Sequence, residues 1–188
     1  MAVILPPLGD RVRVPVRTLF VGINPGMRSA AIGHHFAGPS NRFWKLLYES
    51  ELVTEPIGTE EDHRLPEWGF GITNLVPRAT PGIDALRPAE YVAGAHALRR
   101  KVRRWKPAVV ALVGVTLFRV VFAIKPGVRI ALGLQPERTM LEGARVFVLP
   151  NPSGRNAHFS YQEMLAAITR LRRWLILTEP RRTQRPRG

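Results

Sequence analysis

Hydrophobic residues in this chain fall into short continuous runs, separated by longer stretches in which they recur every three or four positions. Four of the runs are rich in β-branched residues and bounded by turn formers, which predicts buried strands at 18–23, 70–75, 108–113 and 146–149. A run at 128–132 predicts a fifth strand that pairs with 146–149 as a hairpin or ribbon.

Two long amphipathic helices are predicted between and after these strands. The first begins at Pro88, a residue favoured at the first helical position, and ends before Pro107. The second follows Ser160, whose spacing to Glu163 is that of a capping box. Helices that alternate with continuously apolar strands predict an α/β fold with a short, mostly parallel sheet covered on both faces.

The length and composition predict one globular domain over residues 1–177, followed by a basic tail over 178–188 that we expect to be disordered. The absence of cysteine excludes disulfides, thiolate nucleophiles and cysteine-held metal clusters. No apolar stretch approaches the roughly 18 residues of a membrane span, and the N-terminus lacks the pattern of a secretory signal. We therefore expect a cytoplasmic protein, associated with the nucleoid if the chain is bacterial.

The charge favours a polyanionic partner. The chain holds 28 Lys and Arg against 14 Asp and Glu, which gives a net charge of +14. The tail contributes +3, so the domain itself carries +11 (14 minus 3). Only four of the cations are lysine, an imbalance that coding bias alone can produce. Nucleic acid is nevertheless the partner that this balance predicts best.

The loops after the strands are the places to look for chemistry, because ligands of parallel sheets bind beyond the carboxyl ends of the strands. The loops after the first, second and last strands read NPGMRSAAIGHHFAGPSNRFW, VPRATPG and PNPSGRNAHFS. The first and last each contain an Asn-Pro pair followed closely by glycine. We expect these two loops to face one another across a cleft.

Four ordered motifs in and around these loops resemble those of the mismatch-specific uracil and thymine DNA glycosylases, a branch of the uracil-DNA glycosylase superfamily. The motifs are GINPG (22–26), GHHFAGPSNRFW (33–44), GITNLVPRATPG (71–82) and NPSGRNAHF (151–159). The resemblance runs from about residue 17 to about residue 176.

The resemblance implies a fold, an activity and a partner. The fold is a three-layer α/β/α structure with a short central parallel sheet. The activity is hydrolysis of the N-glycosidic bond of uracil, and by extension of thymine or exocyclic cytosine adducts, opposite guanine. The partner is double-stranded DNA with G·U or G·T mispairs, and the resemblance implies no metal, no organic cofactor and no membrane. We expect a monomer.

Asn24, in the first motif, is the predicted catalytic residue. Its amide can bond a water on the face of the sugar opposite the leaving base, once the nucleotide has been extruded from the duplex. Because an amide is not a base, the bond must break largely by dissociation, and we expect a slow enzyme. The alternative is that Asn24 and Pro25 form only a turn.

Other residues of the first three motifs are predicted to line a base pocket. By resemblance, Phe36 stacks on the extruded base, although core packing is the competing interpretation. His35 and Asn74 match pocket positions whose donors can meet uracil carbonyl oxygens, and His34 is the weaker candidate of the histidine pair.

Two further residues have roles that the sequence leaves open. Ser29 lies where a side chain crowds or admits the pyrimidine C5 position, and therefore bears on the choice between uracil and thymine. Asn41 is either a pocket residue or the cap of a short helix.

The fourth motif supplies six residues that the resemblance places against DNA: Asn151, Pro152, Ser153, Gly154, Arg155 and Asn156. Pro152 and Gly154 allow close approach of the backbone, and Ser153 can bond a phosphate. Arg155 falls where relatives insert a side chain into the vacated base stack. Asn156 either bonds the edge of the widowed guanine or is a surface loop residue.

Three alternatives remain from sequence alone. A noncatalytic nucleic-acid-binding module explains the charge but not the pattern of Asn24, Phe36 and Asn74. A nucleotide-binding α/β enzyme is disfavoured, since no Walker loop or GxGxxG fingerprint follows the first strand. The nearest alternative is a broader uracil-DNA glycosylase that also acts on single strands and on A·U pairs.

Overall fold

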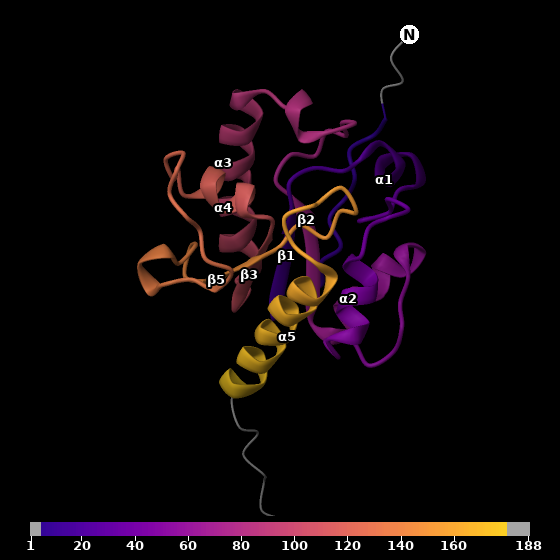
Figure 1. The fold of residues 1–188 in the computed structure, drawn as a ribbon, viewed down its shortest axis with the longest axis vertical. Helices are drawn as coiled ribbons and strands as arrows, with labels where there is room; N and C mark the ends of the chain where they lie inside the picture. Colours follow the sequence, from indigo (N-terminus) through magenta and orange to yellow (C-terminus); the bar gives the residue numbers. More distant parts are fainter. Residues whose placement is uncertain (1–4, 180–188) are drawn as a thin grey trace, which may run out of the picture.

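The computed structural model describes residues 5–179, which form a five-stranded sheet packed between helices (Figure 1). The strand order is β2-β1-β3-β5-β4. The strands are β1 (Thr18–Gly22), β2 (Phe70–Asn74), β3 (Val109–Val113), β4 (Gly133–Leu134) and β5 (Arg145–Leu149). The first four in spatial order are parallel, and β4 is antiparallel to β5. The α/β fold with a mostly parallel sheet is confirmed.

The register of the sheet brings the important loops to one edge. Gly22, the last residue of β1, pairs with Asn74, the last residue of β2. Val113 of β3 likewise pairs with Leu149 of β5. Since all four strands point the same way, the segments that follow them emerge together at the carboxyl edge.

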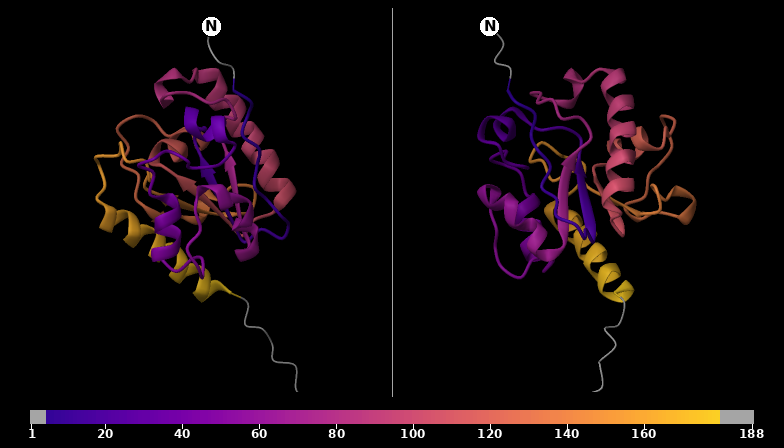
Figure 2. Two further views of the ribbon diagram at one scale, coloured as in Figure 1. Left: turned by 90° about the vertical axis from the view of Figure 1, so that its right-hand side faces the viewer. Right: turned by 180° about the vertical axis from the view of Figure 1, so that it is seen from behind.

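Helices cover both faces of the sheet, which gives three layers (Figure 2). The α-helices are α1 (Met27–Ile32), α2 (Phe43–Glu49), α3 (Pro88–Trp105), α4 (Val115–Val121) and α5 (Tyr161–Thr178). Short 3-10 helices are η1 (Thr59–Trp68), η2 (Ile83–Ala85) and η3 (Glu137–Thr139). Helices α2 and α5 pack on one face, and α3 and α4 pack on the other. Both long helices predicted from the sequence are confirmed, and Ser160 caps α5 with Glu163 as the capping box requires.

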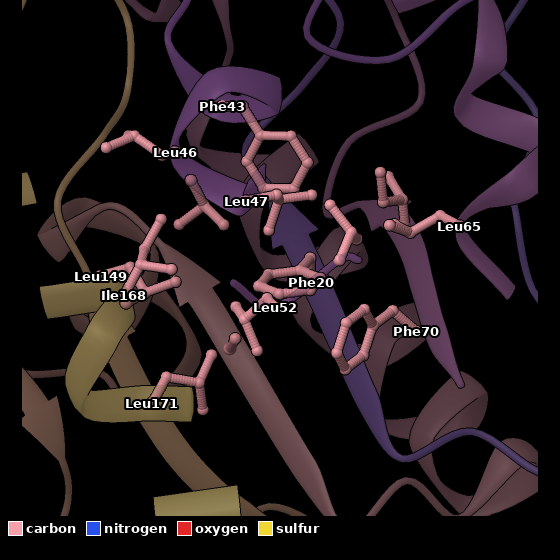
Figure 3. Packing of buried hydrophobic residues seen from close by; sticks show 14 of the residues in the cluster. Phe20, Phe43, Leu46, Leu47, Leu52, Leu65, Phe70, Leu149, Ile168 and Leu171 are labelled. Atoms are coloured by element: carbon pink, nitrogen blue, oxygen red, sulfur yellow. The ribbon is translucent and has the colours of Figure 1, made fainter. Parts of the chain in front are cut away.

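Alternation along β1 divides the buried side chains into two cores. Phe20 points toward α2 and α5, where its ring meets those of Phe43 and Phe70 edge to face (Figure 3). Leu19 and Val21 point to the opposite side, against α3 and α4. A strand buried on both faces needs apolar residues at every position, and this explains the continuous run in the sequence.

The predicted strand at 128–132 is wrong in position, although its predicted partner is correct. The strand that pairs with β5 is β4, which begins at Gly133. The preceding segment is held differently, because Arg119 donates hydrogen bonds to the carbonyl oxygens of Lys125 (3.1 Å) and Val128 (2.5 Å). These carbonyls are therefore occupied by a side chain rather than by a neighbouring strand.

The expected basic tail lies outside the described residues except for Thr178 and Glu179. Glu179 forms an ion pair with Arg17 (2.8 Å) beside the amino end of β1. Among the helices of residues 5–179, none has the length and apolar character needed to cross a membrane.

Candidate active site at the carboxyl edge of the sheet

The side chain of Asn24 lies two residues beyond β1, is partly exposed and is held in one orientation. Its Nδ2 donates to the carbonyl oxygens of Pro25 (3.2 Å) and Arg78 (3.1 Å) and to Oγ1 of Thr80 (2.7 Å). The first motif is thereby tied to the loop that follows β2. A backbone hydrogen bond from Thr80 to Pro25 (3.2 Å) reinforces this connection.

Thr80 decides which end of the Asn24 amide is the donor. The Thr80 hydroxyl gives its own proton to the Gly82 carbonyl (2.7 Å), so its oxygen can only accept from Asn24. Within residues 5–179 no donor bonds to Oδ1 of Asn24. The site therefore presents a fixed, uncharged acceptor that is able to take a hydrogen bond from a water molecule.

Two residues before Asn24 in the chain, the side chains of Asn74 and Phe36 converge on Gly22. A Cβ atom at Gly22 would lie 2.7 Å from Oδ1 of Asn74 and 3.6 Å from Cζ of Phe36, so only glycine leaves room for both side chains. Asn24 follows Gly22 by two residues, which places its Cα within about 7 Å of the glycine. The backbone of Asn24 is thus close to the point where the Asn74 amide and the edge of the Phe36 ring meet.

Phe36 is partly exposed and held in a strained backbone conformation. Its φ is +52°, a value that costs a residue with a Cβ about 1–3 kcal/mol. Its ring stacks on Phe43, with 4.0 Å between centroids and 22° between planes. Buried Ser29 accepts a hydrogen bond from the backbone N–H of Ala37 (3.0 Å), which fixes the chain just beyond the ring. Strain of this kind is concentrated at functional sites.

His35 lies behind Asn74 and is 1% exposed. Its Nε2 lies 2.9 Å from the Gly9 carbonyl, so this nitrogen carries the proton, and Nδ1 lies 3.5 Å from Nδ2 of Asn74. Burial lowers the pKa of His35, partly opposed by the bond to Gly9, so the ring is neutral. The ring donor is thus already used, and His35 is placed to support Asn74 rather than to touch a ligand.

A hollow of about 250 Å³ lies where the segments after β1, β2, β3 and β5 meet, and Ile23, the neighbour of Asn24 in the chain, lines it. Asn24, Phe36 and Asn74 are not among its lining residues, which include both apolar and polar side chains. The lining residues are Ile23, Ile83, Gly114, Val115, Thr116, Asn151, Ser153, Arg155, Asn156, His158 and Phe159. Such a surface suits a ligand with both a flat apolar part and anionic or polar groups.

The second and fourth motifs, which lie in the segments after β1 and β5, are in direct contact, whereas the sequence predicted that these two segments face one another across a cleft. The backbone N–H of Arg42 donates to the Pro152 carbonyl (3.0 Å). A Cβ at Gly154 would lie 2.3 Å from the Cβ of Ser40, so the glycine is required by close packing of the two loops. Arg155 is exposed, and its Nη1 donates to the Pro81 carbonyl (3.2 Å). Arg155 therefore crosses from the β5 loop to the loop after β2.

Comparison with known families agrees with this arrangement. The family model described as Uracil DNA glycosylase superfamily matches residues 10–172. The chain belongs to this superfamily. Its activity is that of a DNA glycosylase, a hydrolase that removes uracil from DNA, and the match covers every motif described above.

In this uracil-DNA glycosylase, two asparagines with open roles take part in loop structure. Oδ1 of Asn41 accepts from the backbone N–H of Phe43 (2.9 Å), the first residue of α2, although the N-cap position itself is Arg42. Asn156 donates to the Asn151 carbonyl (2.8 Å) and accepts from the His158 N–H (3.0 Å), so its amide braces the loop. Both ends of the Asn156 amide are therefore bonded within the loop, while Asn41 uses its oxygen at the start of α2.

Other residues of the glycosylase site were not found from the sequence. Thr80 is buried and orients Asn24, while Gly114, Val115 and Thr116 after β3 line the hollow. Thr80 stands in the quoted motif VPRATPG, but nothing local to it indicates a contact with Asn24. The loop after β3 has one signal that was available, a glycine directly after a buried strand, and Gly114 has a φ of +127°.

Proposed function

We propose that this glycosylase acts on uracil opposite guanine in double-stranded DNA, extruding the nucleotide and leaving an abasic site. Thymine and exocyclic cytosine adducts opposite guanine are the further substrates that the resemblance suggests. The observation that supports this proposal most strongly is the fixed Oδ1 of Asn24, which accepts no hydrogen bond from residues 5–179 and stands two residues along the chain from the glycine on which Asn74 and Phe36 converge.

Asn24 directs the attacking water in this proposal. The water donates one hydrogen bond to Oδ1, and its oxygen then faces the anomeric carbon of the extruded nucleotide. An amide oxygen removes little of the water's proton, so the glycosidic bond breaks first and the sugar develops positive charge. The water oxygen then bonds to C1′ and releases its proton to the departing base or to solvent.

The departing pyrimidine takes the bonding electron pair as an N1 anion. Phe36 supplies a stacking surface for that base, worth roughly 1–3 kcal/mol and independent of base identity. Asn74 supplies an amide at the pocket wall, which can bond the base edge as negative charge grows on its carbonyl oxygens. Uracil is electron-poor, and this stabilises the leaving anion further.

The site favours simple hydrolysis over a lyase step that needs an amine nucleophile. All four lysines lie in the described residues, and none lines the hollow. Lys45 pairs with Glu49 (3.5 Å) and Lys101 with Asp10 (2.8 Å), both outside this lining. We therefore propose a monofunctional enzyme.

Preference for guanine mispairs has two physical sources in this proposal. A G·U or G·T wobble pair costs less to open than a matched pair, so extrusion is easier. Arg155 is long, cationic and part of the lining of the hollow, so it can leave the Pro81 carbonyl, fill the vacated stack and contact the orphan guanine.

The test is base release from labelled duplexes that contain G·U, G·T or A·U, and from single-stranded DNA with uracil, followed by alkaline cleavage of abasic sites. We expect the fastest release from G·U. Equal rates on A·U and on single strands would replace this proposal with the broader uracil glycosylase. A strand break without alkali would contradict the monofunctional mechanism.

A further inference from the structure

We propose that Asp62 is a positioning residue, which holds segment 33–37 and with it the Phe36 ring in the place that base release requires. This inference rests on the proposed function, because it assigns Phe36 to the extruded base. Asp62 lies in η1, outside all four motifs, and does not itself face the hollow.

The Asp62 carboxylate is fully buried and receives donors from two separate segments. Oδ1 accepts from Nε of Arg11 (2.9 Å) and from Nδ1 of His34 (3.0 Å). Oδ2 accepts from the backbone N–H of His35 (2.9 Å). A carboxylate only accepts, so Nδ1 of His34 carries the proton of that bond. Two consecutive residues, His34 and His35, are thus tied together with Arg11 to one side chain.

Arg11 completes this arrangement. Its Nη2 donates to the Gly33 carbonyl (2.7 Å) while its Nε donates to Asp62. One guanidinium therefore binds both Asp62 and segment 33–37, which Asp62 holds. The backbone of Arg11 exchanges two hydrogen bonds of 2.9 Å with Ile72, which anchors it to β2. The segment is thereby fixed to the sheet and not merely to a neighbouring loop.

A buried carboxylate needs such donors to remain charged. Burial by itself would raise the pKa of Asp62, but the bonds from His35 N–H, Arg11 and His34 together hold the pKa below its usual range. The charge is therefore kept at neutral pH, and the charged form makes the strongest bonds to all three donors.

The residue whose backbone Asp62 bonds is the direct neighbour of Phe36 in the chain. Phe36, with its φ of +52°, directly follows His35, and Ala37 directly follows Phe36. Asp62 fixes the residue before the ring, and Ser29 fixes the one after it. A strained residue persists only where its surroundings determine it, and these two bonds supply that constraint.

The decisive variant is Asp62→Asn, which keeps the shape of the side chain but removes its charge. Its NH₂ group would also face one of the N–H donors that now bond the carboxylate. Glu60→Gln is the matched control, because it removes the same charge from an exposed position in η1. We expect Asp62→Asn to slow single-turnover release of uracil from a G·U duplex by about ten-fold or more, since small misplacements of reacting groups have large effects. Binding of a G·C duplex and the rate of Glu60→Gln should match the wild type.

A double-mutant cycle with Phe36→Ala separates positioning from general stability. If Asp62 acts through the ring, then Asp62→Asn will add little once the ring is gone, and the double variant will release uracil at the rate of Phe36→Ala. If Asp62→Asn slows uracil release by the same factor in the wild type and in Phe36→Ala, the inference is overturned.

Hydrogen exchange of the amides of residues 33–37 gives a readout that does not depend on catalysis. We expect faster exchange there in Asp62→Asn, with α5 unchanged. Unchanged exchange at 33–37 would overturn the positioning role even in an active enzyme. If the wild type releases no base from any duplex, the proposed function fails. Hydrogen exchange at 33–37 still tests whether Asp62 holds that segment.

A second variant keeps the proposal testable if Asp62→Asn does not fold. Arg11→Lys keeps the charge but cannot reach both Asp62 and Gly33 as a fork. Arg13→Lys is its control, since the exposed Arg13 in the same segment bonds only the Pro66 carbonyl (3.3 Å). Faster exchange at 33–37 in the first and not in the second is the expected result, and equal exchange in both would overturn the inference.

Discussion

The proposed chemistry of this site depends on one uncharged side chain, Asn24. Its neighbours bond the Nδ2 atom and leave only Oδ1 available to a water molecule. Pro25, Arg78 and Thr80 all accept from its Nδ2. Without that constraint the amide could turn over and present N–H groups to the water. The orientation of Asn24 is therefore as important as its identity.

Thr80→Val tests this orientation. The valine keeps the shape but removes the acceptor for Asn24 and the donor to Gly82, which should cost about 1–3 kcal/mol of folding free energy. We expect single-turnover uracil release to fall by about ten-fold, because a freed amide spends less time with Oδ1 toward the water. Thr139→Val, which removes a hydroxyl bonded to a carbonyl in the distant η3, should leave the rate unchanged. A Thr80→Val enzyme as fast as the wild type would show that Thr80 does not orient Asn24.

His35 predicts how folding stability depends on pH. Its pKa in the folded protein lies below the ordinary value of 6.5, so below about pH 6.5 the unfolded chain binds a proton that the folded protein does not. Its contribution is complete above 6.5 and is lost as pH falls toward the folded pKa. Thermal unfolding measured from pH 8 to pH 5 should show a steeper loss for the wild type than for His35→Gln. Parallel curves for the two proteins would mean that burial of His35 has no such effect.

The parallel strands bring together loops that are distant in the chain. Close backbone contacts then hold these loops against one another. Gly154 against Ser40 and Arg42 against Pro152 join the fourth motif to the second. Arg155 extends from this locked pair across to Pro81. A side chain based on a fixed loop is suited to filling a gap in a base stack.

Arg155→Ala should therefore harm duplex substrates more than single strands, since only a duplex has a stack to fill. We expect the ratio of release rates, G·U duplex over single-stranded uracil, to fall by about ten-fold, or about 1.4 kcal/mol. Arg104→Ala is the charge-matched control, as Arg104 lies exposed in the last turn of α3, away from the hollow. Equal slowing of both substrates would contradict the role of Arg155 in the stack.

Sequence predicted the elements well where the signal was local, and poorly where it depended on tertiary contacts. The apolar run at 18–23 and the Ser160 capping box needed no distant partner to be interpreted. The strand at 128–132 failed because the side chains of Arg119 and Gln135 take up carbonyls there, at Val128 and Ala131. Asp62 and Thr80 could not be recognised, since their roles exist only once η1 has folded against the second motif and the loop after β2 against the first.

For the molecule as a whole, the excess of positive charge implies salt-dependent binding to DNA. We expect most of this to belong to the described domain, because residues 180–188 hold four arginines of a net +14. A chain that ends at Glu179 should keep its melting temperature and its single-turnover rate. Its duplex affinity should still fall steeply with salt, by about 0.9 in log K per log salt for each phosphate contact. Loss of all duplex binding on truncation would instead make residues 180–188 the principal DNA contact.

The most direct test of the account compares Asn24→Ala with the wild type for both uracil release and binding of a G·U duplex. The account predicts that release falls by at least about a hundred-fold while duplex affinity stays within about three-fold, because Asn24 acts on the water and not on DNA. Release by Asn24→Ala at the wild-type rate, or parallel loss of release and binding, would contradict it.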